Sequence, residues 1–192
     1  MRTALAHALS LAGHPAIVMP LAAGFAAAAN GASPDLTRIV LMVTGGITAT
    51  VLVYSFVQVR RGKWVDGDAS APQERSQLNL FLAPLLAAAA AWAGWSGQPF
   101  ALAVGLGLAA ALVAVALVAT RWFKLSLHTA FAVLAAGLFW PDLHLVVLGL
   151  GLAGLIAWSR LHLARHTFAD LVAGVLAGGV AAGAFQFFLA GP

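Results

Sequence analysis

Residues 159–170 read Ser-Arg-Leu-His-Leu-Ala-Arg-His-Thr-Phe-Ala-Asp and form a polar stretch between two long apolar runs. Ionisable side chains are energetically costly in a membrane-embedded chain, so a cluster of them indicates a functional site. If the segment from His166 onward is helical, His166 and Asp170 lie one turn apart on the same face. The carboxylate of Asp170 can then orient the imidazole and leave one nitrogen free as a nucleophile, with Arg160 nearby to bind an anion.

The composition around this stretch determines the class of protein. Apolar residues make up 62% of the 192 residues, charged residues make up 8%, and the mean hydropathy is +0.95. These values exclude a soluble globular domain. The length accommodates six to seven spans of about 20 residues each. We therefore predict an all-α fold, a polytopic transmembrane helical bundle that forms a single integral membrane domain over residues 1–192.

The apolar runs give the order of the spans. We predict spans at about residues 9–29, 39–59, 78–95, 99–120, 129–140, 143–158 and 168–189. The first run could alternatively be a signal peptide, but Pro15 and Pro20 interrupt it and favour a retained span. The fifth and sixth spans are short, so they either begin within the polar segments or tilt steeply. Gly174 and Gly178 lie four residues apart in the last span, a spacing that favours close contact between helices.

Three polar segments fall on one side of this span order, at residues 60–77, 121–128 and 159–166. Nine of the ten Lys and Arg residues lie on that side, and only Arg38 lies on the other. By the positive-inside rule, we predict that this side faces the cytoplasm and that the protein lies in a bacterial inner membrane. Membrane orientation and contact with lipid headgroups explain the net charge of +4, so we expect no nucleic-acid partner.

The order Ser-Arg, five residues, His, three residues, Asp resembles the third signature of the type 2 phosphatidic acid phosphatase (PAP2) superfamily. The second signature of the family, Pro-Ser-Gly-His, corresponds to Leu-Ser-Leu-His at residues 125–128, so Leu125 and Leu127 replace the proline and the glycine. The first signature, a Lys followed six residues later by Arg-Pro, corresponds to Asp68 and Arg75, so only the arginine is kept.

The resemblance covers about residues 60–175, and it implies a PAP2-like core over about residues 60–190 behind an additional N-terminal span at about residues 9–29. It also implies a metal-independent phosphatase without a cofactor, working through a phosphohistidine. His166 would attack phosphorus while Asp170 holds its tautomer, and His128 would protonate the leaving alkoxide and then activate water.

Further side chains would hold the phosphate oxygens in this interpretation: Arg75, Ser126, Ser159 and Arg160. Lys124 is a candidate to replace the cation that the first signature lacks, as a point charge beside the phosphate. Such chemistry depends mainly on positioning and positive charge, which is why the interpretation requires no metal.

Other interpretations of single residues stay open at this point. His166 with Asp170 could be a structural polar pair, and His128 could be an interfacial histidine. Asp66 and Asp68 could bind Mg²⁺ together with phosphate, although two carboxylates on a loop are more often solvated. The remaining histidines receive no role from the sequence: His7, His14, His144 and His162.

The predicted function is removal of a terminal phosphate from a membrane lipid such as phosphatidic acid, phosphatidylglycerol phosphate or a polyprenyl diphosphate. Three alternatives share the same residues: a lipid phosphotransferase, a protein that binds lipid phosphate without turnover, and an anion transporter. The transporter is disfavoured because the charged groups lie at one interface and not at mid-membrane. The chain contains no cysteine, which excludes a disulfide and a thiolate nucleophile. The headgroup and the oligomeric state are left open.

Overall fold

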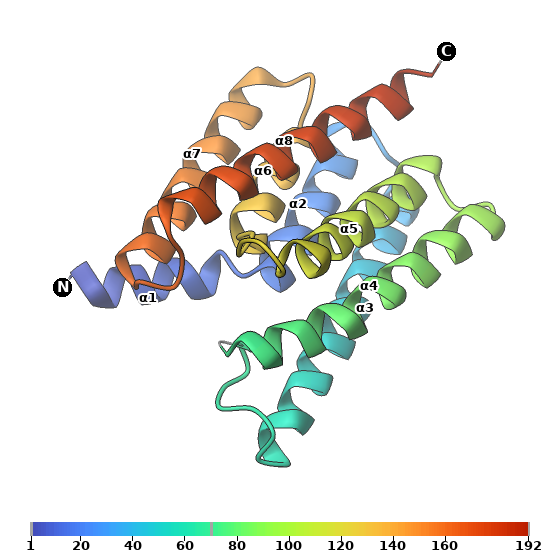
Figure 1. Cartoon of the computed structure of the whole chain (residues 1–192). Coiled ribbons are helices and arrows are strands. Elements are labelled where there is room, and N and C mark those ends of the chain that lie inside the picture. The colour runs from blue at the N-terminus through green and yellow to red at the C-terminus, as the bar shows by residue number, and fades with distance from the viewer. Residues whose placement is uncertain (1, 70, 192) are drawn as a thin grey trace.

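The structure is a computed structural model that describes residues 2–69 and 71–191. Within these ranges every regular element is an α-helix, which agrees with the predicted all-α class (Figure 1). The helices are α1 (Arg2–Ala12), α2 (Pro15–Ala29), α3 (Pro34–Arg60), α4 (Pro72–Trp95), α5 (Phe100–Ala119), α6 (Leu127–Gly137), α7 (Leu143–His162) and α8 (Phe168–Ala190).

The helix starts follow from residues that satisfy or avoid the free backbone N–H groups of a first turn. The side chains of Ser33, Asp142 and Thr167 accept hydrogen bonds from such groups at the starts of α3, α7 and α8. Proline has no N–H to satisfy and opens α2, α3 and α4. Polar residues and prolines between the apolar runs therefore mark where these helices begin.

Five helices are long and apolar enough to cross a membrane, namely α3, α4, α5, α7 and α8. A sixth span results if α1 and α2 are counted together, although the pair is bent by 56°. The bend falls at Gly13 and His14, because a residue before proline avoids helical backbone angles and His14 is extended. The integral membrane character is thus supported, and the span predicted at about residues 9–29 falls within this bent pair.

The predicted fifth span at about residues 129–140 is wrong, because the helix α6 in this place is too short to cross a bilayer. Its 11 residues rise only about 16 Å, roughly half of a bilayer core of about 30 Å. Residues 128–136 are all buried, so α6 is enclosed by its neighbours and does not face lipid. The predicted close contact through Gly174 and Gly178 is confirmed, because a Cβ at Gly174 would lie 2.7 Å from the Ser126 carbonyl oxygen. The small residues of α8 therefore let α6 sit close against it.

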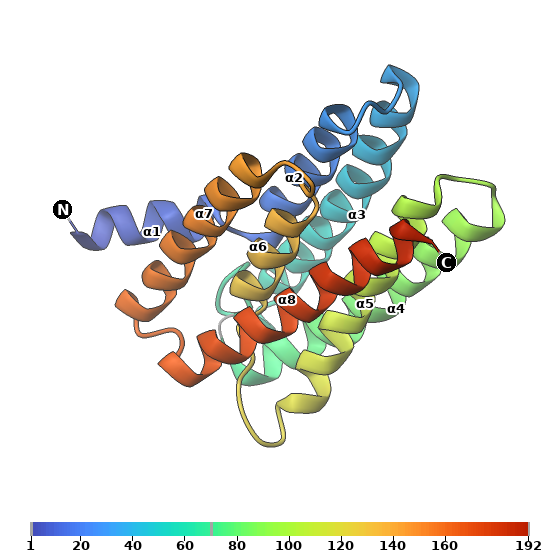
Figure 2. The same ribbon diagram turned by 90° about the horizontal axis from the view of Figure 1, so that it is seen from above.

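Figures 1 and 2 show how the helices are arranged around α6. The helices α2 and α3 pack as one pair, α4 and α5 pack as a second pair, and α6 packs against α7 and α8. α2 and α5 also contact α6, so α6 lies at the centre of the bundle. α1 packs against α7, and its N-terminal end extends away from the other helices.

Candidate active site

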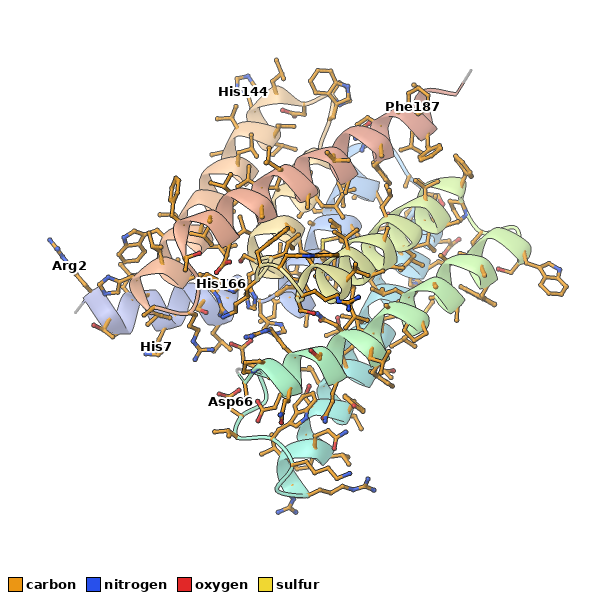
Figure 3. All side chains as sticks on the ribbon, viewed as in Figure 1. Arg2, His7, Asp66, His144, His166 and Phe187 are labelled. Atoms are coloured by element: carbon orange, nitrogen blue, oxygen red, sulfur yellow. The ribbon has the colours of Figure 1, made fainter. Side chains whose placement is uncertain are left out.

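Three connecting segments meet at one end of the bundle: residues 61–69 after α3, 120–126 after α5 and 163–167 after α7. Asp68 forms an ion pair with Arg165, and the Lys124 ammonium donates to the Arg165 carbonyl oxygen. In Figure 3, His166 lies toward this end, whereas His144 and Phe187 lie toward the opposite end. The polar segments that the sequence places on one side are therefore in direct contact.

His166 and Asp170 are held together by the start of α8. The Asp170 carboxylate accepts a hydrogen bond from the Thr167 backbone N–H at 2.8 Å, and the Thr167 hydroxyl accepts one from the Asp170 N–H at 3.3 Å. This reciprocal cap fixes the carboxylate. His166 Nδ1 lies 3.6 Å from Asp170 Oδ2, within ion-pair range and slightly beyond a hydrogen bond. His166 precedes the helix, yet the predicted approach of the two side chains is present.

The surroundings of His166 favour its neutral form. The pKa of His166 is lowered to about 4, mainly by burial and also by the positive charges of Lys124 and Arg160, with Asp170 opposing them. The imidazole is therefore uncharged at neutral pH. A histidine that attacks phosphorus needs an unprotonated nitrogen, so this environment suits a nucleophile.

Asp68 lies at the centre of the site, in contact with four basic side chains. Its Oδ2 faces Arg165 and, at 3.4 Å, Arg160 Nη1. Its Oδ1 faces His14 Nε2 at 3.5 Å and His128 Nε2 at 3.8 Å. We call these four residues together with Asp68 the Asp68 cluster. The interpretation of Asp68 as a solvated loop carboxylate is wrong, because the folded chain surrounds it with two guanidinium groups and two imidazoles.

The charge of Asp68 follows from these contacts. Burial by itself would raise the pKa of Asp68, but the hydrogen bond with His14 and the charges of His128 and Arg160 outweigh it. The pKa is therefore well below its usual range, and the carboxylate is ionised at any pH at which the protein works.

The sequence does not point to His14 or Ser10 as site residues. His14 reaches the site because α1 and α2 bend there, and its Nδ1 accepts a hydrogen bond from the Ala16 N–H at 3.2 Å. The Ser10 hydroxyl accepts from Arg160 Nη1 at 2.8 Å. The contacts of His14 with Asp68 and of Ser10 with Arg160 join residues far apart in the chain. The one sequence signal for them is a polar residue before Pro15 in an otherwise apolar run.

Several buried polar atoms of the site have no hydrogen-bond partner among the residues that the structure describes. They are His128 Nε2, Arg160 Nε and His166 Nδ1. Buried polar groups are normally paired, so an unpaired group at a site indicates a ligand or water. The two that belong to the Asp68 cluster are donors or can be protonated, which suits an anionic ligand.

His14, Asp68 and His128 could also hold a metal ion, since their ligand atoms lie within 4.8 Å of one another. The hydrogen bonding of His14 speaks against this use. Its Nδ1 accepts from a backbone N–H, so the proton of the neutral ring is on Nε2, the atom that faces Asp68. Arg160 and Arg165 already compensate the carboxylate charge. The donor set therefore fits an anion better than a cation.

The two predicted serines occupy structural positions. Ser126 is fully buried, and its hydroxyl caps α6 and lies 3.1 Å from the Thr129 hydroxyl. Ser159 is fully buried, and its hydroxyl donates to the Ile156 carbonyl oxygen at 2.7 Å. Neither lines the cavity described next, so the structure does not bring them to the phosphate position predicted from the sequence.

The site forms the polar end of a cavity of about 820 Å³ that runs between α2, α3, α4, α5 and α6. His128, Arg75, Lys124, Arg160 and His166 all line it, so five predicted residues are brought together, with Asp170 behind His166. Burial lowers the pKa of Lys124, with the charge of Arg75 adding and that of Asp170 opposing. A lysine in these surroundings is a good partner for an anion.

Most of the remaining cavity wall is apolar. Leucines from several helices line it, together with Met19, Phe131 and Phe185: Leu36, Leu82, Leu86, Leu102, Leu106 and Leu138. The volume is in the range of cavities that enclose small-molecule ligands. The cavity therefore offers one charged end and one long apolar compartment.

Comparison of the chain with protein-family models, with curated proteins and with solved structures gives no match. A function for the chain therefore depends on its own residues and their geometry.

Proposed function

We propose that the protein is a membrane-embedded lipid phosphate phosphatase with a PAP2-like core. The observation that carries the proposal is a cluster of histidines and arginines, with unpaired buried nitrogens, at the polar end of an apolar cavity. The cationic end suits a phosphate, and the apolar compartment suits the hydrocarbon part of a lipid.

In the first step His166 acts as the nucleophile. Its Nδ1 faces Asp170, which favours the tautomer with the proton on Nδ1 and a free lone pair on Nε2. Nε2 forms a bond to phosphorus while the ester P–O bond breaks. His128, protonated in the complex with the anionic phosphate, donates this proton to the departing alkoxide, so the lipid leaves as an alcohol and His166 carries the phosphate.

In the second step water releases the phosphate. His128, now neutral, accepts a proton from the water as its oxygen bonds to phosphorus and the P–N bond breaks. His166 returns to its neutral form and inorganic phosphate leaves. Arg75, Lys124 and Arg160 hold the non-bridging oxygens, and their charge compensates the charge that develops on the transferred group.

The substrate classes follow from the cavity and from the membrane. A phosphatidic acid, a phosphatidylglycerol phosphate or a polyprenyl diphosphate each joins a phosphate to a hydrocarbon chain that stays in the bilayer. The excess of Lys and Arg at the site end supports a cytoplasmic active face in a bacterial inner membrane. Phosphotransfer to an alcohol instead of water would use the same two histidines.

One observation favours a second candidate, a protein that binds lipid phosphate without turnover. Asp68 lies at the position of the first-signature lysine and is surrounded by the basic side chains that would bind phosphate. A carboxylate there opposes the binding of a second anion.

Phosphate release by the purified full-length protein in detergent, with EDTA present, tests the proposal. We expect release from at least one of the three lipid classes, and loss of release in His166→Ala and in His128→Ala. His144→Ala serves as the control, because His144 is exposed at the opposite end of the bundle. Release that needs a divalent metal, or that survives loss of His166, would contradict the mechanism. Phosphate-analogue binding without release would favour the second candidate.

A further inference from the structure

The Asp68 carboxylate lies at the point where four basic side chains converge. Oδ2 faces the guanidinium groups of Arg160 and Arg165, and Oδ1 faces the imidazoles of His14 and His128. Guanidinium groups and imidazole N–H groups are the usual partners of phosphate oxygens as well as of carboxylates. The position of the carboxylate therefore marks a binding site for an oxyanion.

The Asp68 carboxylate does not accept a hydrogen bond from every donor around it. Arg160 is 6% exposed, and its Nε has no hydrogen-bond partner among the described residues. The same holds for Nε2 of His128, which is 9% exposed. A carboxylate is planar and offers two oxygens, whereas a phosphate group offers three non-bridging oxygens in a tetrahedral arrangement. The third oxygen gives the unpaired donors an acceptor.

Hydrogen bonds hold the chain in place on both sides of Asp68. The Trp64 indole donates to the Gln77 side chain at 2.9 Å, and the Val65 N–H donates to Glu74 at 2.7 Å. Glu74 also accepts from the Ala71 N–H at 3.1 Å. Asp68 thus lies between two attached points. Its carboxylate can leave the cluster by a local movement while these attachments stay in place.

We propose that Asp68 is an internal ligand of a phosphate site, and that His14 and Arg165 bind the incoming phosphate together with His128 and Arg160. The substrate phosphate enters when the Asp68 carboxylate leaves. The inference rests on the proposed function for the lipid nature of the substrate, but inorganic phosphate is sufficient to probe the site itself. Two residues without an assigned role, His14 and Arg165, become binding residues, and Asp68 lowers the affinity of the site.

Binding of inorganic phosphate to the full-length protein in detergent, measured by calorimetry with EDTA present, tests this inference. We expect Asp68→Asn to lower the Kd for phosphate by about tenfold or more, because the site is then free in every molecule. In the Asp68→Asn protein, further replacement His14→Ala or Arg165→Gln should reverse the gain. Asp35→Asn removes the same charge from an exposed residue and should leave the Kd unchanged.

Two outcomes would overturn the inference. An unchanged or weaker phosphate affinity in Asp68→Asn would mean that the carboxylate does not compete with phosphate. A divalent cation that binds the wild-type protein and is lost in both Asp68→Asn and His14→Ala would mean that the cluster is a metal site. Phosphate binding as expected without turnover of any lipid would retain the inference and reject the phosphatase. Turnover of a lipid phosphate together with an unaltered Kd for inorganic phosphate in Asp68→Asn would support the phosphatase and reject the inference.

A second measurement keeps the test independent of the folding of Asp68→Asn. The chain has no cysteine, so Gly67→Cys provides a single labelling site beside Asp68. Gly67 is exposed, and a Cβ added there has no heavy atom within 4 Å. A spin label at this position should become more mobile as phosphate is added. A spectrum that does not respond to saturating phosphate would contradict displacement of Asp68.

Discussion

Among single residues, His166 has the environment that bears most directly on the proposed chemistry. Its pKa is lowered to about 4, mainly by burial, so the proposed nucleophile is neutral from about pH 5 upward. A histidine exposed to water is already half protonated at about pH 6.5. The buried position thus keeps the nucleophile competent in mildly acidic conditions, while Lys124 stays close enough to influence it.

We predict that the acid limb of kcat/KM lies near pH 4, because activity falls as His166 becomes protonated. Lys124→Ala removes a positive charge that lowers the pKa of His166, so the acid limb should move to higher pH in that variant. A pH–rate profile from pH 3.5 to 8 measures both. An acid limb at pH 6.5 in the wild type, unmoved in Lys124→Ala, would show that another group controls the reaction.

Asp170 combines two functions that substitutions can separate. Asp170→Asn removes the charge that orients His166, and we expect kcat to fall by on the order of 10²- to 10⁴-fold. Thr167→Ala removes the other half of the reciprocal cap and leaves the carboxylate in place. It should cost about 1 kcal/mol of stability with little loss of kcat. Equal losses of kcat in the two variants would indicate that Asp170 acts only as a cap.

Among the secondary-structure elements, α6 depends most on its neighbours. A Cβ at Gly178 of α8 would lie 2.9 Å from Val133 Cβ and 3.0 Å from Ala130 Cα. We therefore expect Gly178→Ala to destabilise the protein by about 1–3 kcal/mol. Gly179→Ala, where the added Cβ meets open space, should instead stabilise it by up to about 1 kcal/mol through helix propensity. Thermal unfolding in detergent compares them, and shifts of the same sign would contradict this packing.

The sequence predicts those elements whose signal is contained within one stretch of chain. The long apolar runs of α3, α4, α5, α7 and α8 are visible by composition, and the His166–Asp170 pair is visible by spacing. The short helix α6 is not distinguishable from a span by hydropathy, because a helix enclosed by apolar neighbours is as apolar as one that faces lipid. Its length and burial are properties of the packed bundle.

The Asp68 cluster could not be predicted for a similar reason. His14, Asp68 and His128 are separated by more than 50 residues each, and no local period relates them. Asp68 also replaces the lysine that the resemblance leads one to expect, and two carboxylates on one loop, Asp66 and Asp68, are more often solvated. Only the folded chain shows that the bend after α1 carries His14 to the same place.

For the whole molecule, the cavity connects the charged site to the interior of the bundle. A lipid whose phosphate lies at His166 has room for hydrocarbon along the apolar walls formed by α2, α4, α5 and α6. Burial of a chain in this compartment contributes roughly 0.8 kcal/mol for each CH₂ group that leaves water. Affinity for soluble substrates should therefore rise with chain length until the compartment is full.

Narrowing the compartment tests this relation between cavity and substrate. Ala109 is 5% exposed and lines the cavity, so Ala109→Phe should lower kcat/KM for a long-chain lipid phosphate by about tenfold or more. The same variant should hydrolyse a short water-soluble alkyl phosphate as the wild type does, because the charged end is unchanged. Val115→Phe adds a phenyl ring on the same helix, at a residue that is 51% exposed, and should affect neither substrate. Equal losses of kcat/KM for the long and the short substrate in Ala109→Phe would mean that the added ring disturbs the histidine site. Such a result would contradict binding of the lipid tail in the cavity.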